Sequence, residues 1–476
     1  MLNSIKTSPN YRWFVFLNVA LGTLMATLDG SIVNVALPTM ANEFQVDINV
    51  LQWIPAAYIL TITGFLLTFG RLADIYGKNR IYRIGFIGFV IGSILCGLST
   101  SSQLLIYSRV IQGLGAAMMM ANSLGIIIEA FPKEERGRAL GTMGTVVAVG
   151  NLTGAPLGGI LTGTVGWQSI FFINVPIGIL GLILSFFILP KDNIPETKGK
   201  FDYLGASLWL IGVVALIIGL TRVETLGWSK NVILTTSFGL VLLLLFYRIE
   251  TKSKEPLIDM NLFKNPIFLK GNITKLISFI TLIMVTLFLP FYFQDGKGLE
   301  PYQVGLLMMV MPITLSVISP LSGYLSDKYG YVILTVGGMA LLSSNLFLFS
   351  RITLDTPIYL VIAAQIIFGI ATGMFQSPNN TLIMSVVPKS QLGIAGGIIA
   401  TMRNFGKVVG IALSVGIFSA RLRIYTETRG EEAFINALSD IFLVAAVIAF
   451  LGLVICISDI KHIKDINSHK DVVEQN

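Results

Sequence analysis

Long apolar runs recur along this chain of 476 residues and leave little room for any other kind of structure. The hydrocarbon core of a bilayer is about 30 Å thick, so a helix needs about 20 apolar residues to cross it. The predicted spans are 13–37, 50–72, 82–100, 103–130, 138–164, 168–189, 203–221, 231–249, 267–294, 303–325, 332–350, 357–386, 393–420 and 436–458. The pattern therefore predicts an all-α integral membrane protein with fourteen transmembrane helices.

Composition agrees with this prediction and excludes several other classes of protein. Only 12% of the residues are charged and 54% are apolar, whereas a soluble domain carries about 25% charged residues. The net charge of +7 comes from basic residues scattered between apolar runs, so it does not indicate a nucleic-acid partner. Lys and Arg concentrate in alternate loops, which predicts that both termini lie in the cytoplasm.

An internal repeat divides the chain. Several landmarks recur at one constant offset: Gly113 and Gly369, Pro132-Lys133 and Pro388-Lys389, Gly141 and Gly397, Gly154 and Gly410; more loosely, residues 70–77 match 323–330. The repeat predicts two lobes of the same orientation. We expect an N-terminal six-helix lobe at 1–189, an inserted two-helix segment with polar loops at 190–260, a C-terminal six-helix lobe at 261–460 and a cytoplasmic polar tail at 461–476.

Two ionisable residues at membrane depth are the first candidates for a functional site, because such residues are costly in a bilayer. Asp29 lies roughly 14 Å, and Arg109 roughly 9 Å, from the outer end of its predicted helix. Burial disfavours a charged carboxylate and a neighbouring guanidinium favours it. Asp29 is therefore predicted to accept a proton or a cationic substrate, while Arg109 adjusts the pKa of its carboxyl group. The alternative is that the two residues form a structural ion pair.

The chain resembles a known family in five segments. Residues 28–38 (LDGSIVNVALP) resemble the helix-1 signature of the fourteen-helix drug:H⁺ antiporters of the major facilitator superfamily. The further similar segments are 70–80 with the superfamily's loop motif, 109–113 with its helix-4 motif, 150–159 with the antiporter motif of helix 5, and 167–176 with the segment opening helix 6 of that branch.

The resemblance implies two six-helix lobes with two extra central helices, and roles for individual residues. Asp29 would be the membrane-embedded acid, Arg109 the coupling residue and Asp74 a cytoplasmic gate residue. The implied gate and hinge positions are Gly70, Asp74, Gly77, Gly113, Gly154, Pro156, Gly158 and Gly159. The glycine-rich stretch that holds the last four of these also permits close helix packing without a hinge.

Three departures from the family pattern stand out. Ala155 separates Gly154 from Pro156, which rotates the expected kink by roughly 100°. Gln168 replaces an Arg, and Lys407 replaces a small residue.

Three bases, Lys275, Arg403 and Lys407, lie within predicted spans, and the latter two are four residues apart on one helix face. They are structural, by snorkelling or pairing, or they give the cavity affinity for an anionic or zwitterionic compound.

Aromatic and methionine side chains complete a candidate cavity. Such residues suit promiscuous binding of apolar molecules, although they also pack or face lipid. The candidate cavity residues are Trp53, Tyr58, Met119, Lys275, Tyr292, Phe375, Gln376, Arg403 and Lys407.

We therefore predict a proton-coupled exporter of amphipathic toxic compounds, an antibiotic-resistance type of transporter working by alternating access in a bacterial plasma membrane. The partners expected are a small-molecule substrate, protons and lipid; a monomer is expected to function, with no cofactor, no metal and no nucleic acid. The alternative is a proton-coupled exporter of an endogenous anionic or zwitterionic metabolite, lipid or peptide. An enzyme is disfavoured because no embedded histidine, cysteine pair or carboxylate dyad occurs, and no ATP-binding signature is present.

Overall fold

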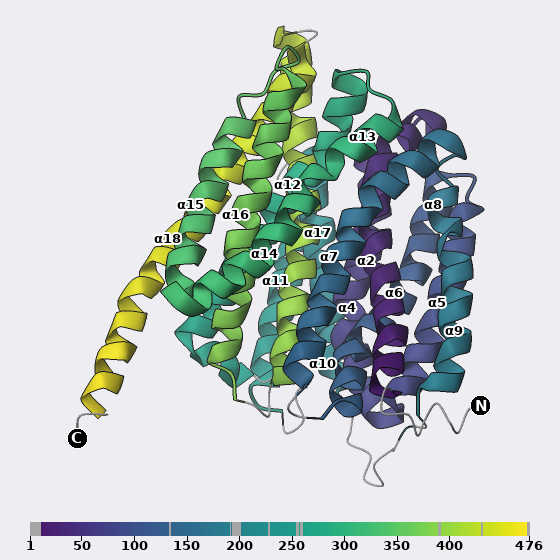
Figure 1. Cartoon of the computed structure of the whole chain (residues 1–476). Coiled ribbons are helices and arrows are strands. Elements are labelled where there is room, and N and C mark those ends of the chain that lie inside the picture. Colours follow the sequence, from purple (N-terminus) through teal and green to yellow (C-terminus); the bar gives the residue numbers. More distant parts are fainter. Residues whose placement is uncertain are drawn as a thin grey trace. The chain divides into compact units, whose positions relative to one another are not determined.

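Every regular element in the described part of the chain is a helix (Figure 1). The computed structural model describes residues 11–132, 135–190, 192, 201–226, 229–253, 257, 260–388, 392–429 and 432–473. The first helices are α2 (Tyr11–Phe44), α3 (Ile48–Leu51), α4 (Trp53–Tyr76), α5 (Lys78–Gly97), α6 (Ser102–Ala130), α7 (Arg136–Thr164), α8 (Ser169–Phe172), α9 (Asn174–Ile188), α10 (Tyr203–Leu226) and α11 (Lys230–Glu250). They are followed by η1 (Met260–Lys264), α12 (Pro266–Phe291), the π-helical turn η2 (Tyr292–Gly296), α13 (Pro301–Met308), α14 (Val310–Tyr329), α15 (Tyr331–Phe349), α16 (Ile358–Ser385), α17 (Leu392–Arg429) and α18 (Ala433–Val473).

The predicted spans coincide with these helices. Within the described residues, 13 helical segments are long and apolar enough to cross a membrane. The remaining predicted span, 138–164, coincides with α7, a 29-residue helix outside that set. The prediction of an all-α membrane protein is therefore confirmed, and the exact number of crossings stays a prediction.

Three predicted spans are interrupted where the sequence analysis expected continuous helices. The span 50–72 breaks at Gln52, the span 168–189 breaks at Ile173, and the span 303–325 breaks at Met309. Pro55, Pro176 and Pro312 follow three residues after these breaks. Because proline has no amide hydrogen, it cannot bond to the carbonyl four residues earlier, and its ring crowds that carbonyl.

The chain divides into two compact units. Unit 1 comprises Met1–Asp259, Leu289–Met309 and Ile411–Gly416, and unit 2 comprises Met260–Phe288, Val310–Gly410 and Ile417–Asn476. In unit 1, α2 packs against α6, α7 and α9, while α5 packs against α6 (Figure 1). The two helices of the predicted insertion, α10 and α11, pack on each other, and the Trp209 indole on α10 donates to the Thr63 carbonyl of α4 at 3.2 Å.

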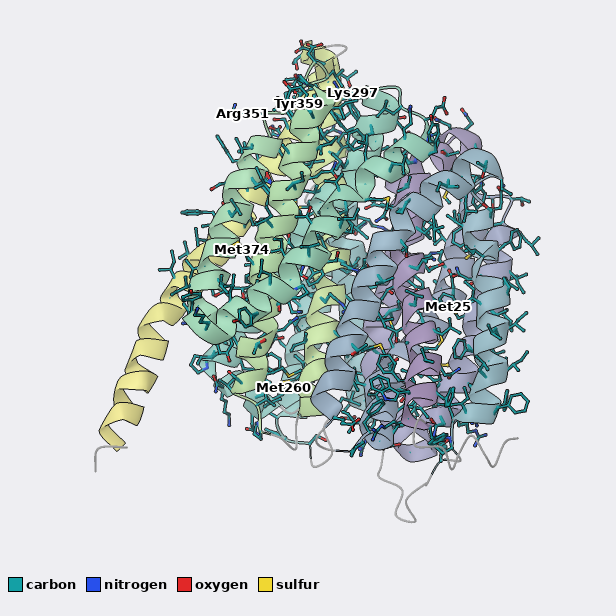
Figure 2. The ribbon with its side chains drawn as sticks, viewed as in Figure 1. Met25, Met260, Lys297, Arg351, Tyr359 and Met374 are labelled. Atoms are coloured by element: carbon teal, nitrogen blue, oxygen red, sulfur yellow. The ribbon has the colours of Figure 1, made fainter. Side chains whose placement is uncertain are left out.

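Unit 2 is built on α15 and α16, with α14 packed on α16 and α18 packed on α15. Figure 2 shows Arg351 and Tyr359, in and after the loop between α15 and α16, at one end of this unit and Met260 at the other end. The helices between these points therefore run the length of the unit.

The glycine landmarks of the repeat make equivalent contacts in the two units. A Cβ at Gly113 would lie 2.9 Å from the Tyr58 carbonyl oxygen on α4, and one at Gly369 would lie 2.8 Å from the Met311 carbonyl oxygen on α14. Two turns of the looser match also agree, since Gly77 and Gly330 have φ of +100° and +90° and each precedes a helix. The sequence repeat is thus a structural repeat.

A second pair of close contacts fixes the equivalence of further helices. A Cβ at Gly154 of α7 would lie 3.0 Å from the Leu28 carbonyl oxygen of α2. A Cβ at Gly410 of α17 would lie 2.8 Å from the Ile280 carbonyl oxygen of α12. Leu28 and Ile280 therefore occupy corresponding positions in the two units.

The turn between α4 and α5 is held by a residue that the sequence analysis did not single out. Asp192, which follows α9, accepts hydrogen bonds from the backbone amides of Asn79 at 2.8 Å and Arg80 at 3.0 Å. A carboxylate at a helix N-terminus satisfies free amides and complements the helix dipole. Two features favour glycine at position 77. Its φ is positive, and a Cβ there would lie 2.5 Å from Asp192 Oδ2. Asp74 lies in the last turn of α4, and its side chain lies outside the described part.

The glycine-rich stretch of α7 forms a tight seam with its neighbours. Gly150, Gly154 and Gly158 are four residues apart, so they share a face, and each contacts α2. Gly159 contacts α13, where a Cβ would lie 2.5 Å from the Pro301 carbonyl oxygen. The helix continues through Pro156.

We predict that Gly158→Ala lowers the thermal unfolding midpoint of the detergent-solubilised protein by at least about 3 °C. The added Cβ would lie 2.5 Å from the Ile32 carbonyl oxygen, and overpacking costs about 1–3 kcal/mol. Gly163→Ala is the matched control on the same helix, since its Cβ would meet ordinary contacts at 3.7 Å. Equal midpoints for the two variants would contradict the seam.

Candidate ion-pair site

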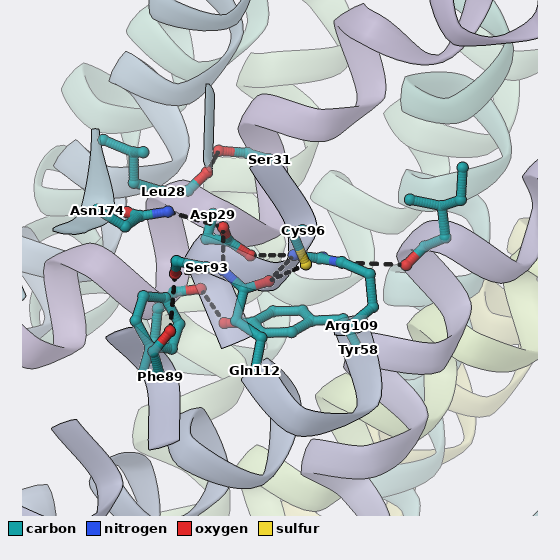
Figure 3. A network of polar contacts seen from close by, with 12 residues as sticks. Leu28, Asp29, Ser31, Tyr58, Phe89, Ser93, Cys96, Arg109, Gln112 and Asn174 are labelled. Atoms are coloured by element: carbon teal, nitrogen blue, oxygen red, sulfur yellow. Dashed lines mark hydrogen bonds and ion pairs between the residues drawn. The ribbon is translucent and has the colours of Figure 1, made fainter. Parts of the chain in front are cut away.

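Asp29 is fully buried in the middle of α2, where its carboxylate is the centre of a polar network (Figure 3). Oδ2 forms an ion pair with Arg109 Nη1 of α6. Oδ1 accepts two neutral amide hydrogen bonds, from Gln112 Nε2 at 2.8 Å and from Asn174 Nδ2 at 2.9 Å. The carboxylate is therefore held from α6 and from the first residue of α9.

Arg109 is also fully buried and is fixed on several sides. Its Nε donates to the Ile54 carbonyl at 3.1 Å, and its Nη1 also donates to Gln112 Oε1 at 2.6 Å. The guanidinium carbon lies 4.0 Å from the centre of the Tyr58 ring and 5.7 Å from that of Phe171, which adds cation–π attraction. Among the described residues, Nη2 has no hydrogen-bond partner.

Gln112 links this pair to α5. Its Nε2 also donates to Ser93 Oγ at 2.9 Å, and its Oε1 is contacted by Cys96 Sγ at 3.6 Å. Ser93 in turn donates to the Phe89 carbonyl at 2.8 Å (Figure 3). Because Gln112 supplies both a donor and an acceptor to the ion pair, it fixes the spacing of the two charges.

The network can hold a buried charge and respond to a proton. A carboxylate accepts hydrogen bonds only, whereas a protonated carboxyl group must donate one. Proton uptake at Asp29 would therefore conflict with one of its three N–H donors and force a change that involves α6 or α9. Among the described residues there is no group of three or more His, Cys, Asp or Glu side chains that could hold a metal ion.

The structure brings some predicted residues together and separates others. Asp29, Arg109 and Tyr58 form one site in unit 1, with the Tyr58 hydroxyl donating to the Ala26 carbonyl at 2.9 Å. Trp53 and Tyr292 also belong to unit 1; Trp53 is partly exposed and Tyr292 is buried. Met119 is buried between α5 and α6, where its Cγ would lie 2.9 Å from a Cβ at Gly85.

The other predicted cavity residues belong to unit 2. Lys275 of α12 and Lys407 of α17 both approach the Phe279 ring, at 5.6 and 6.0 Å from its centre. Arg403 lies one turn before Lys407. Phe375 is fully buried, and Gln376 is partly buried on α16.

Among the gate and hinge positions, Gly70 lies in α4 with open space around it, and Gly113 packs tightly on α4. The departure at Gln168 is compensated locally. Its Nε2 lies 3.4 Å from Glu43 Oε1, while the Trp167 indole donates to Glu43 Oε2 at 2.8 Å.

Gln112 and Asn174 are the two partners of Asp29 that the sequence analysis did not assign. Both lie within segments that carry the family resemblance, 109–113 and 167–176. The available signal was a neutral amide side chain within an apolar helix, and Gln112 stands three residues after Arg109, on the same face. Such side chains need a buried partner.

Comparison with known proteins decides the family. The profile of the Major Facilitator Superfamily matches residues 19–411. The chain belongs to the Major Facilitator Superfamily. This facilitator is a multi-pass transporter of the cell membrane and not an enzyme.

Three relatives are similar to this chain over most of its length. The riboflavin transporter RibZ of Clostridioides difficile is 36% identical over 94% of this facilitator and 97% of its own length. The multidrug resistance protein Stp of Mycobacterium tuberculosis is 32% identical, over 87% of this chain and 77% of its own. The methylenomycin A resistance protein of Bacillus subtilis is 31% identical, over 84% and 86%. The predicted resemblance to resistance transporters is confirmed.

We predict that Arg109→Met destabilises this facilitator strongly, because it leaves the Asp29 carboxylate buried without its counter-charge. Breaking one side of a buried pair costs about 3–5 kcal/mol, whereas replacing both partners is much less costly. The double variant Asp29→Asn/Arg109→Met is therefore expected to unfold at a higher temperature than Arg109→Met alone. Thermal unfolding in detergent measures both, and additive losses would show that the two side chains are not energetically coupled.

Proposed function

We propose that this facilitator exports amphipathic toxic compounds in exchange for protons, with Asp29 as the residue that carries the proton. The observation that supports this most is the fully buried Asp29 carboxylate, held by Arg109 and by two neutral amides. An ionisable group at membrane depth is costly and is retained where it works. The relatives named for multidrug and methylenomycin A resistance support export as the direction.

Coupling would arise from competition for one carboxylate. When Asp29 is charged, it keeps Arg109, Gln112 and Asn174 in place, which favours one conformation of α2, α6 and α9. When it is protonated, the ion pair is discharged and a hydrogen bond must be exchanged. A proton thus shifts the balance between two conformations, and a substrate that favours the other conformation is exchanged for it by alternating access.

The driving force is sufficient for useful export. One charge moving across 100 mV is worth about 2.3 kcal/mol, and a tenfold gradient costs about 1.36 kcal/mol. One proton per substrate therefore sustains a gradient of roughly fiftyfold.

Three organisational features belong to the same proposal. Both termini lie in the cytoplasm, because Lys and Arg concentrate in the loops on that side. The chain is organised as lobes at 1–189 and 261–460 with an inserted segment at 190–260 and a tail at 461–476, and a monomer suffices.

A second candidate function is export of an endogenous anionic or zwitterionic metabolite. The bases Lys275 and Lys407, grouped about one ring in unit 2, favour it. The similarity to a riboflavin transporter shows that relatives at this level of identity include carriers named for a metabolite.

We expect Asp29→Asn to abolish substrate-driven proton release. The protein still folds, because the Arg109 guanidinium keeps its hydrogen bonds to the Ile54 carbonyl and to Gln112 Oε1. The test uses everted membrane vesicles with an acid interior, in which a pH-sensitive dye reports proton release as lipophilic cations, neutral antibiotics and organic anions are added. Glu43→Gln is the matched control, because it neutralises another carboxylate of α2 and is expected to retain proton release. Normal release from the Asp29→Asn variant would refute the proposed coupling.

A further inference from the structure

Three basic side chains, Lys275, Arg403 and Lys407, lie in the long helices α12 and α17 of unit 2. Among the described residues, none of them forms an ion pair. The sequences of α12 and α16 contain no acidic residue, and the first acid of α17 is Glu427, about 30 Å beyond Lys407 along the helix. This part of unit 2 therefore carries positive charge without a neighbouring carboxylate on these helices.

Two of these bases, Lys275 and Lys407, approach one aromatic ring, and Arg403 lies one helical turn before Lys407. Lys275 is only 4% exposed, and its Nζ donates to Asn380 Oδ1 of α16. Its Nζ lies 5.6 Å from the centre of the Phe279 ring, and Lys407 Nζ lies 6.0 Å from the same centre. The grouping depends on Gly406, since a Cβ there would lie 2.7 Å from the Leu276 carbonyl oxygen and 3.1 Å from Phe279 Cβ.

The cluster lies well inside the helices. Lys275 is nine residues from the start of α12, or roughly 14 Å, and Lys407 is roughly 22 Å from the start of α17. Snorkelling relieves lysines near helix ends, so it does not account for these positions. A charge at the centre of a membrane helix is costly, so such residues mark functional sites.

The positions of unit 1 that correspond to two of these bases carry neutral residues. Since Gly410 corresponds to Gly154, Lys407 corresponds to Asn151 of α7. Since Ile280 corresponds to Leu28, Lys275 corresponds to Thr23 of α2. Both counterparts are neutral, so the same packing is achieved in unit 1 without charge.

We propose that Lys275, Arg403 and Lys407 form a subsite of unit 2 that binds the carboxylate or phosphate group of an anionic or zwitterionic amphipathic substrate. Ammonium groups donate charge-assisted hydrogen bonds to such oxyanions, and a guanidinium can bind them in bidentate fashion. The Asn380 amide oxygen holds Lys275 in position, and Phe279 shields both ammonium groups on one side. The subsite defines the substrate class of the proposed exporter and rests on that function for its biological use.

The test measures binding without any pH gradient. The purified full-length protein in nanodiscs of neutral lipid is titrated with one coumarin dye in three forms: the carboxylate, the neutral carboxamide and a cationic aminoalkyl amide. Hydrogen bonds to charged groups contribute about 1.5–3 kcal/mol, so the wild type is expected to bind the carboxylate at least about tenfold more tightly than the carboxamide. Lys275→Met and, independently, Lys407→Met are expected to reduce this preference to within about threefold.

Lys270→Met is the matched control, because it removes a lysine from the same helix, α12, close to its start; it is expected to keep the full preference. Retained carboxamide affinity shows that each variant is folded, and Lys407→Met alone decides the case if Lys275→Met cannot be purified. The proposal is wrong if the wild type binds the carboxylate no more tightly than the carboxamide, or does not bind the carboxylate at all. It is also wrong if the lysine variants lose affinity equally for all three dyes.

Two further arms separate the alternatives. Nanodiscs with anionic lipid in place of neutral lipid are expected to leave carboxylate binding unchanged; competitive loss of binding would assign the site to a lipid headgroup and overturn the proposal. The vesicle assay distinguishes this inference from proton antiport. If the wild type prefers the carboxylate dye but releases no protons, the antiport proposal is wrong and the subsite proposal stands. If it releases protons but shows no carboxylate preference, only the subsite proposal is wrong.

Discussion

The ion pair between Asp29 and Arg109 constrains unit 1 more than any other interaction. Two buried charges are tolerated only if both are paired and their remaining hydrogen-bonding groups are satisfied. That requirement brings Gln112 and Asn174 to the carboxylate and the Ile54 carbonyl and Tyr58 ring to the guanidinium. The helices that carry these residues must therefore approach closely. The glycines at the contacts of α6 with α4 and of α7 with α2 permit it, because a side chain there would collide with backbone or side-chain atoms.

The structural repeat makes the asymmetry of the two units informative. Gly113 and Gly369 are equivalent, so Arg109, four residues before the first, corresponds to Gln365. Leu28 and Ile280 are equivalent, so Asp29 corresponds to Thr281. Unit 2 thus has a neutral pair where unit 1 has its charges. Conversely, the bases of unit 2 have neutral counterparts in unit 1. In the proposed function, the acid of unit 1 and the bases of unit 2 would serve different ligands, a proton and an anionic substituent.

The fold was largely predictable from the sequence, because a bilayer imposes a length and a composition on each helix that hydropathy reveals. The breaks at Gln52, Ile173 and Met309 were missed, because an apolar run has the same composition whether or not its helix is interrupted. Prolines in α2, α7, α14 and α16 lie within continuous helices, so a proline alone does not specify a break. Asp29 and Arg109 were predictable because a charge is conspicuous in an apolar run, whereas Gln112 and Asn174 are common amides whose role depends on which helix lies opposite.

The sequence by itself determined that the chain is a membrane protein, that it contains a repeat, and which ionisable residues lie at membrane depth. These are properties of the composition of the chain and of residue spacing along a single helix, and the bilayer alone constrains both. Only the tertiary structure decided that Gln112 and Asn174 hold Asp29, that Asp192 caps the turn at Gly77, and that Lys275 and Lys407 share the Phe279 ring. These contacts join residues from different helices, and which helix faces meet is decided by the packing of the whole unit.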